Sequence, residues 1–384
     1  MVDNVAPGSA AGDPGQTAAT QARIVGDDTR DGLLQNPFHL TFSPGFIAWL
    51  GHANMALLLT TYQAGKVVLI GPNRGKLTVS ERNFGRAMAM VPVEDGLLLS
   101  TEYAVWRFQN GLRPGRLYDG WDTILLPRSC HVTGAVDTHD IAIDGHGRLL
   151  AVITGYNCIA QLEEKGCFSP LWRPPFVPEI AGEDRCHLNG FCLHNGELAY
   201  ATIIGESNVR DGWREHRTDG GLVIDVRTNR VVCRGLSMPH TPRLYRGSLW
   251  VLEAGCGWLG RIDVETGEYH RLTWCPGFVR GLRFHGDFAL VGLSRPRDKT
   301  FKGLPLDAEL AQRGVESECG VYVIRLSDGE IMHKVAITGS VTEIYDVMAY
   351  PQTQCPMIVG LEAKDVRQLV DIGTDYTGTD YTTR

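Results

Sequence analysis

The chain has 384 residues, of which 43% are hydrophobic, and a chain of this kind buries a large core. Its formal net charge of −7 argues against electrostatic binding to nucleic acid, and no apolar stretch approaches the ~20 residues of a membrane-spanning helix. The 45 glycines and 19 prolines favour a turn-rich β architecture over a helical one.

Residues 1–30 lack the basic start and apolar segment of a classical secretory signal. They are rich in Ala, Gly, Pro, Thr and Asp, which predicts a disordered N-terminal lead. We expect the folded domain over residues 38–365 and a C-terminal tail over residues 366–384.

The ten cysteines form no C-x-x-C pair, which argues against a zinc ribbon or a thioredoxin-type motif. Several of them lie inside apolar runs, among them Cys158, Cys192 and Cys233. Reduced, buried cysteines are the simplest interpretation, and they predict a cytoplasmic protein.

One arrangement recurs along the chain: a short alternating strand, a tight turn at Gly or Pro, and a more apolar strand. It is seen in "RAMAMVPVEDGLLLST" from Arg86, "HDIAIDGHGRLLAV" from His139, "NGFCLHNGELAYAT" from Asn189, "HTPRLYRGSLWVLE" from His240, "RGLRFHGDFALVGLS" from Arg280 and "DVMAYPQTQCPMIVGL" from Asp346. Further hairpins follow several of these segments, at residues 221–232, 260–272 and 320–335.

The repeating unit is therefore four antiparallel strands, which predicts an all-β fold with a single β-propeller. A β-sandwich is the alternative, but it does not need the same unit again and again. Counting the second strands predicts seven blades, whereas counting the outer hairpins predicts six. Residues 55–80 supply three strands before the first full unit, and residues 344–361 lack an outer hairpin, so we expect the chain ends to share one blade.

The first strand of each blade lines the central channel, and its first residues face the channel mouth. The repeat places a polar residue there in six blades, and we call this set the mouth ring: Arg86, His139, Asn189, His240, Arg280 and Asp346. The alternative is that such residues have only a structural role and bind water. Six polar residues converging from separate blades favour a ligand or metal site.

Two chemistries fit the mouth ring, and the sequence leaves both open. His187 lies two residues before Asn189, so His139, His187 and His240 could hold a divalent transition metal such as Zn, Fe or Mn. Alternatively, Arg86 and Arg280 could bind a carboxylate or phosphate, with Asn189 and Asp346 as further substrate contacts.

Two long connections lie between second and third strands, and connections of such length are often functional. The first, residues 205–221, carries Trp213 and Arg214 as predicted substrate contacts and Glu206 and Glu215 as a predicted acid or base. The second, residues 294–320, contains "LPLDAELAQRG", which predicts a short amphipathic helix.

The segments "TTYQAGKVVLIG", "THDIAID", "RCHLNG", "WREHRTDGG", "MPHTPR", "CPGFVRGL" and "GLSRPR" resemble a bacterial family of conserved hypothetical proteins with a domain of unknown function. The resemblance spans roughly residues 38–362 and implies a propeller, but no reaction. More distantly the layout is similar to gluconolactonase-like and NHL-type propellers. The former hold a divalent metal with Glu, Asn and Asp, whereas this chain places His and Arg in most ring positions, which argues against a calcium-type site.

Two functions follow as hypotheses. The first is a metal-dependent enzyme that acts on a small anionic substrate at the channel mouth. The second is a non-catalytic propeller that binds a ligand or presents a rigid surface to a peptide or protein. The sequence gives no indication of the oligomeric state.

Overall fold

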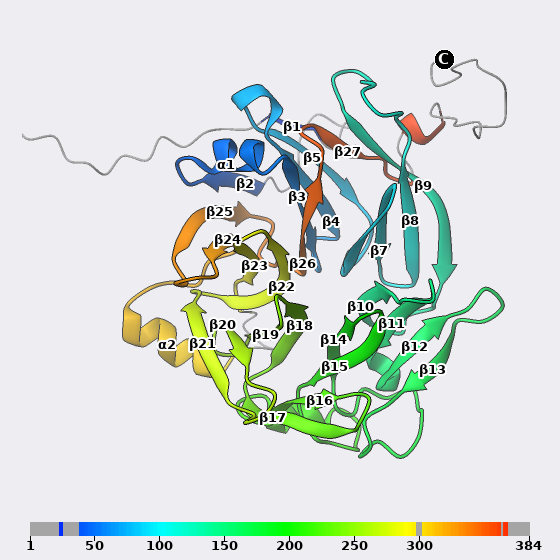
Figure 1. Cartoon of the computed structure of the whole chain (residues 1–384), viewed down its shortest axis with the longest axis vertical. Coiled ribbons are helices and arrows are strands. Elements are labelled where there is room, and N and C mark those ends of the chain that lie inside the picture. The colour runs from blue at the N-terminus through cyan, green and yellow to red at the C-terminus, as the bar shows by residue number, and fades with distance from the viewer. Residues whose placement is uncertain (1–22, 26–37, 297–301, 362–363, 368–384) are drawn as a thin grey trace, which may run out of the picture.

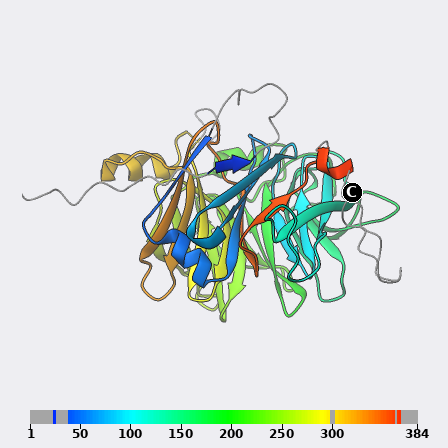
Figure 2. The same ribbon diagram turned by 90° about the horizontal axis from the view of Figure 1, so that it is seen from above.

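The computed structural model of the chain describes residues 23–25, 38–296, 302–361 and 364–367. Six small β-sheets surround a central channel, and the ring of sheets is flattened along the channel axis (Figures 1 and 2). The all-β propeller prediction is confirmed, and the number of blades is six.

Each blade runs outward from an inner strand at the channel. Blade 1 consists of β26 (Asp346–Pro351), β3 (Met55–Thr61), β4 (Lys66–Gly71), β5 (Thr78–Asn83) and β1 (Arg23–Val25). Blade 2 consists of β6 (Met90–Val93), β7 (Gly96–Ser100), β8 (Ala104–Asn110), β9 (Thr123–Val132) and β27 (Pro356–Ile358). Blade 3 consists of β10 (Thr138–Ile143), β11 (Leu149–Ile153), β12 (Cys158–Leu162) and β13 (Phe168–Trp172).

The second half of the ring follows the same order. Blade 4 consists of β14 (Leu188–His194), β15 (Glu197–Ile203), β16 (Gly221–Asp225) and β17 (Arg230–Leu236). Blade 5 consists of β18 (Pro239–Tyr245), β19 (Ser248–Glu253), β20 (Trp258–Ile262) and β21 (Tyr269–Trp274). Blade 6 consists of β22 (Phe278–His285), β23 (Phe288–Ser294), β24 (Gly320–Arg325), β25 (Ile331–Gly339) and β2 (Phe38–Phe42).

Short helices decorate this ring. They are α1 (Phe46–His52), α2 (Pro305–Arg313) and the 3-10 turns η1 (Asn73–Gly75), η2 (Thr154–Tyr156), η3 (Gly212–His216) and η4 (Lys364–Arg367). Helix α2 confirms the amphipathic helix expected in the second long connection, and Leu306 is its buried residue.

The two ends of the chain close the ring together. The late strand β26 is the inner strand of blade 1 and pairs antiparallel with β3, so that Asp346 lies opposite Thr60. Strand β27 then extends blade 2 by pairing parallel with β9, and β2 extends blade 6 by pairing with β25. The shared blade was predicted. Counting second strands predicts seven blades because residues 55–80 resemble the start of a separate blade. In the structure these residues form the outer strands of blade 1, and β26 is its inner strand.

The core lies between neighbouring blades, because each sheet packs both faces against another sheet. Leu97, Leu98 and Leu99 of β7, for example, are all buried, although they point alternately to opposite faces. Between blades 3 and 4, Leu150 packs in one cluster with Phe191. Each buried side chain of this size stabilises the fold by roughly 1.5–3 kcal/mol.

All ten cysteines are free, and eight of them are buried, including the three singled out from the sequence. Cys130 and Cys167 are exposed. None of the helices in the described part of the chain combines the length and hydrophobicity that crossing a bilayer requires. Of the predicted lead over residues 1–30, only β1 is described; the remainder, like residues 368–384 of the predicted tail, lies outside the described residues.

Candidate functional site

The inner strands of all six blades start at the same end of the channel, which we call the mouth. Five members of the mouth ring are among the first three residues of their strands: His139, Asn189, His240, Arg280 and Asp346. The sixth placement needs a correction. Strand β6 begins only at Met90, so Ala89 takes the ring position in blade 2 and Arg86 lies in the preceding loop.

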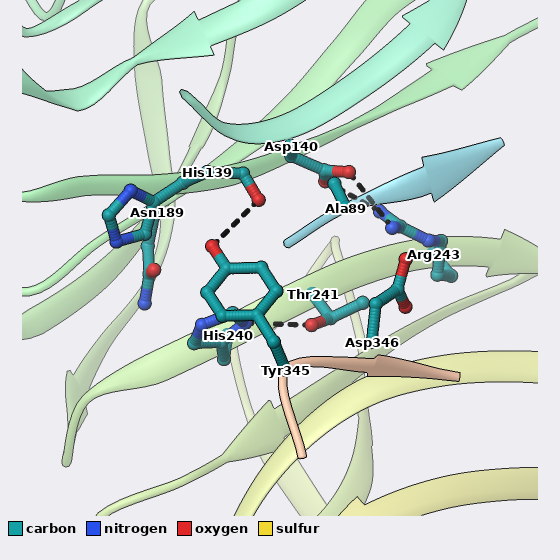
Figure 3. Close-up of a pocket in the computed structure, with 9 residues that line it drawn as sticks. All are labelled: Ala89, His139, Asp140, Asn189, His240, Thr241, Arg243, Tyr345 and Asp346. Carbon is teal, nitrogen blue, oxygen red and sulfur yellow. Dashed lines mark hydrogen bonds and ion pairs between the residues drawn. The ribbon is translucent and has the colours of Figure 1, made fainter. Parts of the chain in front are cut away.

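A narrow cavity opens among these strand starts (Figure 3). Its lining consists of Ala89, His139, Asp140, Asn189, His240, Thr241, Arg243, Tyr345 and Asp346. The enclosed space accommodates about one water molecule. The structure thus gathers four predicted ring residues around a space that fits only a small chemical group.

His139 is held with a defined ring orientation. Its Nδ1 lies 3.1 Å from the backbone oxygen of Asp137, with the Asp137 carboxylate 3.7 Å away. Because a carbonyl oxygen only accepts, Nδ1 carries the hydrogen and Nε2 is the acceptor in the neutral ring. Burial lowers the pKa of His139, and the nearby His187 and Arg280 act in the same direction.

His187 is the partner of His139, with ring centroids 4.9 Å apart in an edge-to-face arrangement. Its Nδ1 donates to Oδ2 of Asp184 at 2.6 Å, and its other face packs on Trp213 at 4.3 Å. Burial acts to raise the pKa of Asp184, but the facing His187 outweighs it and the net pKa is lowered. The structure thus gives His187 an ionised carboxylate as its partner.

Two long loops hold this part of the site in place. Asn157 is fully buried, and its Oδ1 accepts the backbone N–H groups of Arg185 and Cys186. The guanidinium of Arg185 binds Glu183 in its own loop and Asn208 in the first long connection. These bonds join the loop that carries His187 to the loop that carries Trp213.

His240, like His139, contacts the ring of Tyr345. The Tyr345 ring lies 5.9 Å from His139 and 6.0 Å from His240, and its hydroxyl donates to the backbone oxygen of His139 at 2.8 Å. The Nδ1 of His240 bonds Oγ1 of Thr241 at 2.7 Å. Burial and then Arg280 lower the pKa of His240 well below its ordinary value, and burial raises that of Tyr345.

Buried ion pairs lie next to the cavity. Arg243 contacts both carboxylate oxygens of Asp140, at 2.9 and 3.1 Å, and Arg283 lies 3.3 Å from Asp346. Burial is the largest influence on both members of the second pair: it lowers the pKa of Arg283 and raises that of Asp346. Asp346 is therefore engaged within the protein.

The two predicted arginine contacts differ in their surroundings. Arg86 bonds the Tyr62 hydroxyl and lies 3.2 Å from Asp137, outside the cavity lining. Arg280 is buried, with its guanidinium 5.6 Å from the centroid of the Tyr345 ring. Buried side-chain atoms around the mouth that have no hydrogen-bond partner among the described residues include Oδ1 of Asn189, Nε1 of Trp213 and Nε of Arg243. Such atoms are suited to a ligand or water.

The first long connection contributes Trp213 but not its carboxylates. Glu206 pairs with Arg234 at 2.6 Å, and Glu215 is exposed on η3; neither lines the cavity. Arg214 lies over the outer side of the site, with its guanidinium 4.4 Å from the Trp213 ring and 3.0 Å from Asp211. Of the four predicted residues in this connection, only Trp213 contacts a site histidine.

The backbone around the mouth is unusual. Arg86, Asp137, His187, Met238 and Thr241 all have positive φ angles, between 46° and 60°, although none is glycine. This conformation is uncommon for residues other than Gly, Asn and Asp and is unfavourable for the β-branched Thr241. Such strain clusters at functional sites, where the surrounding structure maintains it.

Several site residues escaped the sequence reasoning. Asp184 stands three residues before His187, a spacing that could have suggested a carboxylate–histidine pair. Tyr345 directly precedes the ring residue Asp346, but it belongs to a loop with no repeat pattern. Arg243 and Asp140 come from different blades, so nothing in the local sequence indicates that they pair.

The metal prediction finds no ready ligand set. Within the described residues, no three His, Cys, Asp or Glu side chains are grouped so that they could hold an ion. The Nδ1 atoms of His139, His187 and His240 are hydrogen-bonded, which leaves Nε2 as the nitrogen with which each ring would coordinate a metal. Metal binding stays a prediction.

Fold and site together define a six-bladed β-propeller with a strained, histidine-rich site at one mouth of its channel. The chain belongs to the family described as "Domain of unknown function (DUF4915)", whose model matches residues 44–359. The family resemblance noted in the sequence is thereby confirmed. No curated protein matches the chain.

Solved structures with a similar fold are distant. A protein of unknown function from Bacteroides caccae is 11% identical, with a TM-score of 0.47, and the match covers 77% of this chain and 99% of that one. A putative gluconolactonase is 15% identical, with a TM-score of 0.44 and coverage of 71% and 90%. These likenesses concern the fold and carry no argument about activity.

Proposed function

We propose that the protein is an enzyme that acts on a small anionic substrate at the channel mouth, with His139 and His187 as the proton-transfer pair. The observation that carries the proposal is the contact between these two imidazoles, each with its Nδ1 fixed by its own oxygen acceptor. Fixed tautomers and fixed ring planes are what general acid–base catalysis requires.

The two histidines suit different roles. His139 is buried and its pKa is lowered, so its ring is neutral near pH 7 and Nε2 is a proton acceptor. His187 is oriented by the Asp184 carboxylate through its Nδ1, as in a catalytic triad, so we assign it the role of proton donor in the pair. These positions lead us to assign the acid–base roles to the histidines rather than to Glu206 or Glu215.

The substrate class follows from the charges that face the histidines. Arg280 lowers the pKa of both His139 and His240, which places a positive charge near two neutral rings. A carboxylate or phosphate is the complement of that arrangement. The cavity fits about one water molecule, so only a small group of the substrate enters and the remainder stays at the mouth.

Metal dependence, predicted from the sequence, is a separate question. The described residues do not bring three ligands together, so no catalytic step here is assigned to a metal. Element analysis of the purified protein, before and after incubation with Zn, Fe or Mn, tests it. Stoichiometric metal that is lost in His139→Gln and His240→Gln would support a metal-dependent enzyme.

A non-catalytic binding module is the second candidate, and one observation favours it. The Arg243–Asp140 and Arg283–Asp346 pairs satisfy charges beside the cavity internally, as expected of a channel built for rigidity. In that case the mouth would bind a ligand or a peptide without changing it.

Ligand binding and turnover of small carboxylates and phosphate esters, measured on the full chain and four variants including His187→Gln, test the proposal. We expect Arg280→Gln to weaken binding about tenfold or more, since a charge-assisted hydrogen bond contributes ~1.5–3 kcal/mol. His139→Gln should retain binding but lose at least ~100-fold in turnover. The exposed His52→Gln, on helix α1 and outside the lining of the cavity, is the matched control.

The outcomes separate the two candidates. Binding without turnover, unaffected by His139→Gln, would leave the binding module as the function. Turnover that survives His139→Gln and His187→Gln unchanged would refute the proton-transfer pair.

A further inference from the structure

A second cavity, of about 460 Å³, lies between blades 4 and 5. It lies toward the face of the propeller opposite the mouth. Its residue His194 is the last of β14, whereas the ring residue Asn189 is the second, and five strand residues span about 17 Å. The cavity is therefore separate from the site described above, and its volume lies within the range of small-molecule sites.

The floor of this cavity is apolar and rigid. Tyr200, Leu249 and Ile262 line it and are at least nine-tenths buried, and Leu244 and Val264 complete it. All five are packed in or against one hydrophobic cluster between the two blades. A ligand that enters would therefore meet a preformed apolar surface.

The rim carries groups of positive or potentially positive charge. Arg261 of β20 lies directly opposite His270 of β21, and His194 comes from the facing blade. Within the described residues, the side chains of Arg261 and His194 form neither a hydrogen bond nor an ion pair. Arg261 and His270, which lie opposite each other on neighbouring strands, repel when both are charged, and a bound anion would relieve that repulsion.

The acidic groups nearby are partly engaged. Oδ1 of Asp263 accepts the backbone N–H groups of Glu265 and Thr266, which fixes this carboxylate in its turn. The carboxylate of Glu268 lies 3.8 Å from Nδ1 of His270. Arg261 is thus the group of the rim best placed to receive an anion.

We propose that this cavity binds a small amphipathic carboxylate, with its apolar body on the Tyr200–Leu249–Ile262 floor and its carboxylate on Arg261. The inference does not depend on the function proposed for the mouth. The apolar volume favours a chain or ring of several carbons, which the water-sized cavity at the mouth does not admit.

Calorimetric titration of the full chain with octanoate tests the site. We expect one octanoate per chain from this cavity, and about tenfold weaker binding in Arg261→Gln. Arg234→Gln is the matched control, because Arg234 is an exposed arginine that pairs with Glu206 and does not line the cavity. Octanol and octylamine, with the same chain and no carboxylate, should bind at least tenfold more weakly than octanoate.

A second variant and a second background make the result decisive. Ser248→Trp places a large side chain into the cavity from a half-buried position at the start of β19, and it should abolish binding in a folded protein. Binding should persist in Arg280→Gln, which alters only the mouth. Loss of octanoate binding in Arg280→Gln but not in Arg261→Gln, equal binding of octanol, or no binding at millimolar octanoate would each overturn the proposal.

Discussion

Residues with positive φ angles occur at both ends of the inner strands, but for different reasons. At their ends, Asn195-Gly196 and Arg246-Gly247 have positive φ because each pair forms a two-residue hairpin turn, in which both residues need that conformation. At their starts, Asp137, His187 and Thr241 have positive φ without any such turn. Turn geometry explains the first group, whereas Thr241 lies in a register shift between β18 and β19, and Asp137 and His187 directly precede their strands.

The ion pairs at the two ends of the inner strands differ in burial. The side chains of Arg243 and Asp140, near the mouth, are 15% and 6% exposed. Those of Arg246 and Asp287, at the opposite end, are 57% and 71% exposed. An exposed pair contributes little, whereas a buried charge that loses its partner is costly. The mouth is thus the region where single changes should have large effects.

Removal of the buried carboxylate should give the largest effect. We expect Asp140→Ala to lower the free energy of unfolding by about 3–5 kcal/mol, because it leaves the guanidinium of Arg243 buried without its counter-ion. Asp287→Ala, at the exposed pair, should cost no more than about 1 kcal/mol. Urea unfolding of both variants measures the difference. Equal costs would show that the two ends of the strands are energetically alike.

The repeat made the propeller predictable from the sequence, because each blade repeats the same strand–turn–strand pattern. Five ring positions followed from it, since the heads of β10, β14, β18, β22 and β26 align. Arg86 did not follow, because β6 has only four residues and starts late. A short strand leaves too little pattern to fix its first residue.

What the sequence could not show depends on contacts between blades. The pairing of Arg243 with Asp140 and the contacts of Tyr345 with two histidines join residues more than a hundred positions apart. Local periodicity carries no information on such contacts. The number of blades was open for the same reason, because the closing strand comes from the other end of the chain.

The buried histidines should make stability depend on pH. Their folded-state pKa values are lowered, so below about pH 6.5 the unfolded chain binds protons that the folded protein does not. Stability therefore falls as pH decreases through that window. Between pH 7.5 and 5.5, His240→Gln should lose about 1 kcal/mol less stability than the unmodified protein, as measured by denaturant unfolding at each pH.

The control for this experiment is Asn189→Ala, a change in the same cavity that removes no titrating group. It should lower stability by the same amount at every pH. If His240→Gln shows the same pH dependence as Asn189→Ala, the histidine is not the source of the slope.

The smallest effect is expected at the hairpin between β18 and β19. Arg246→Asn creates an Asn-Gly turn, the favoured pair for this geometry, and should gain up to about 0.5 kcal/mol relative to Asp287→Ala, which removes only the Arg246–Asp287 ion pair. Asn at a positive-φ position of the mouth, Thr241→Asn, should instead lower the free energy of unfolding by about 1 kcal/mol, because the Thr241 hydroxyl is buried and bonded to His240. Chemical denaturation of the three variants decides the matter. A gain at Thr241 would mean that backbone preference, rather than packing around His240, determines the conformation of the mouth.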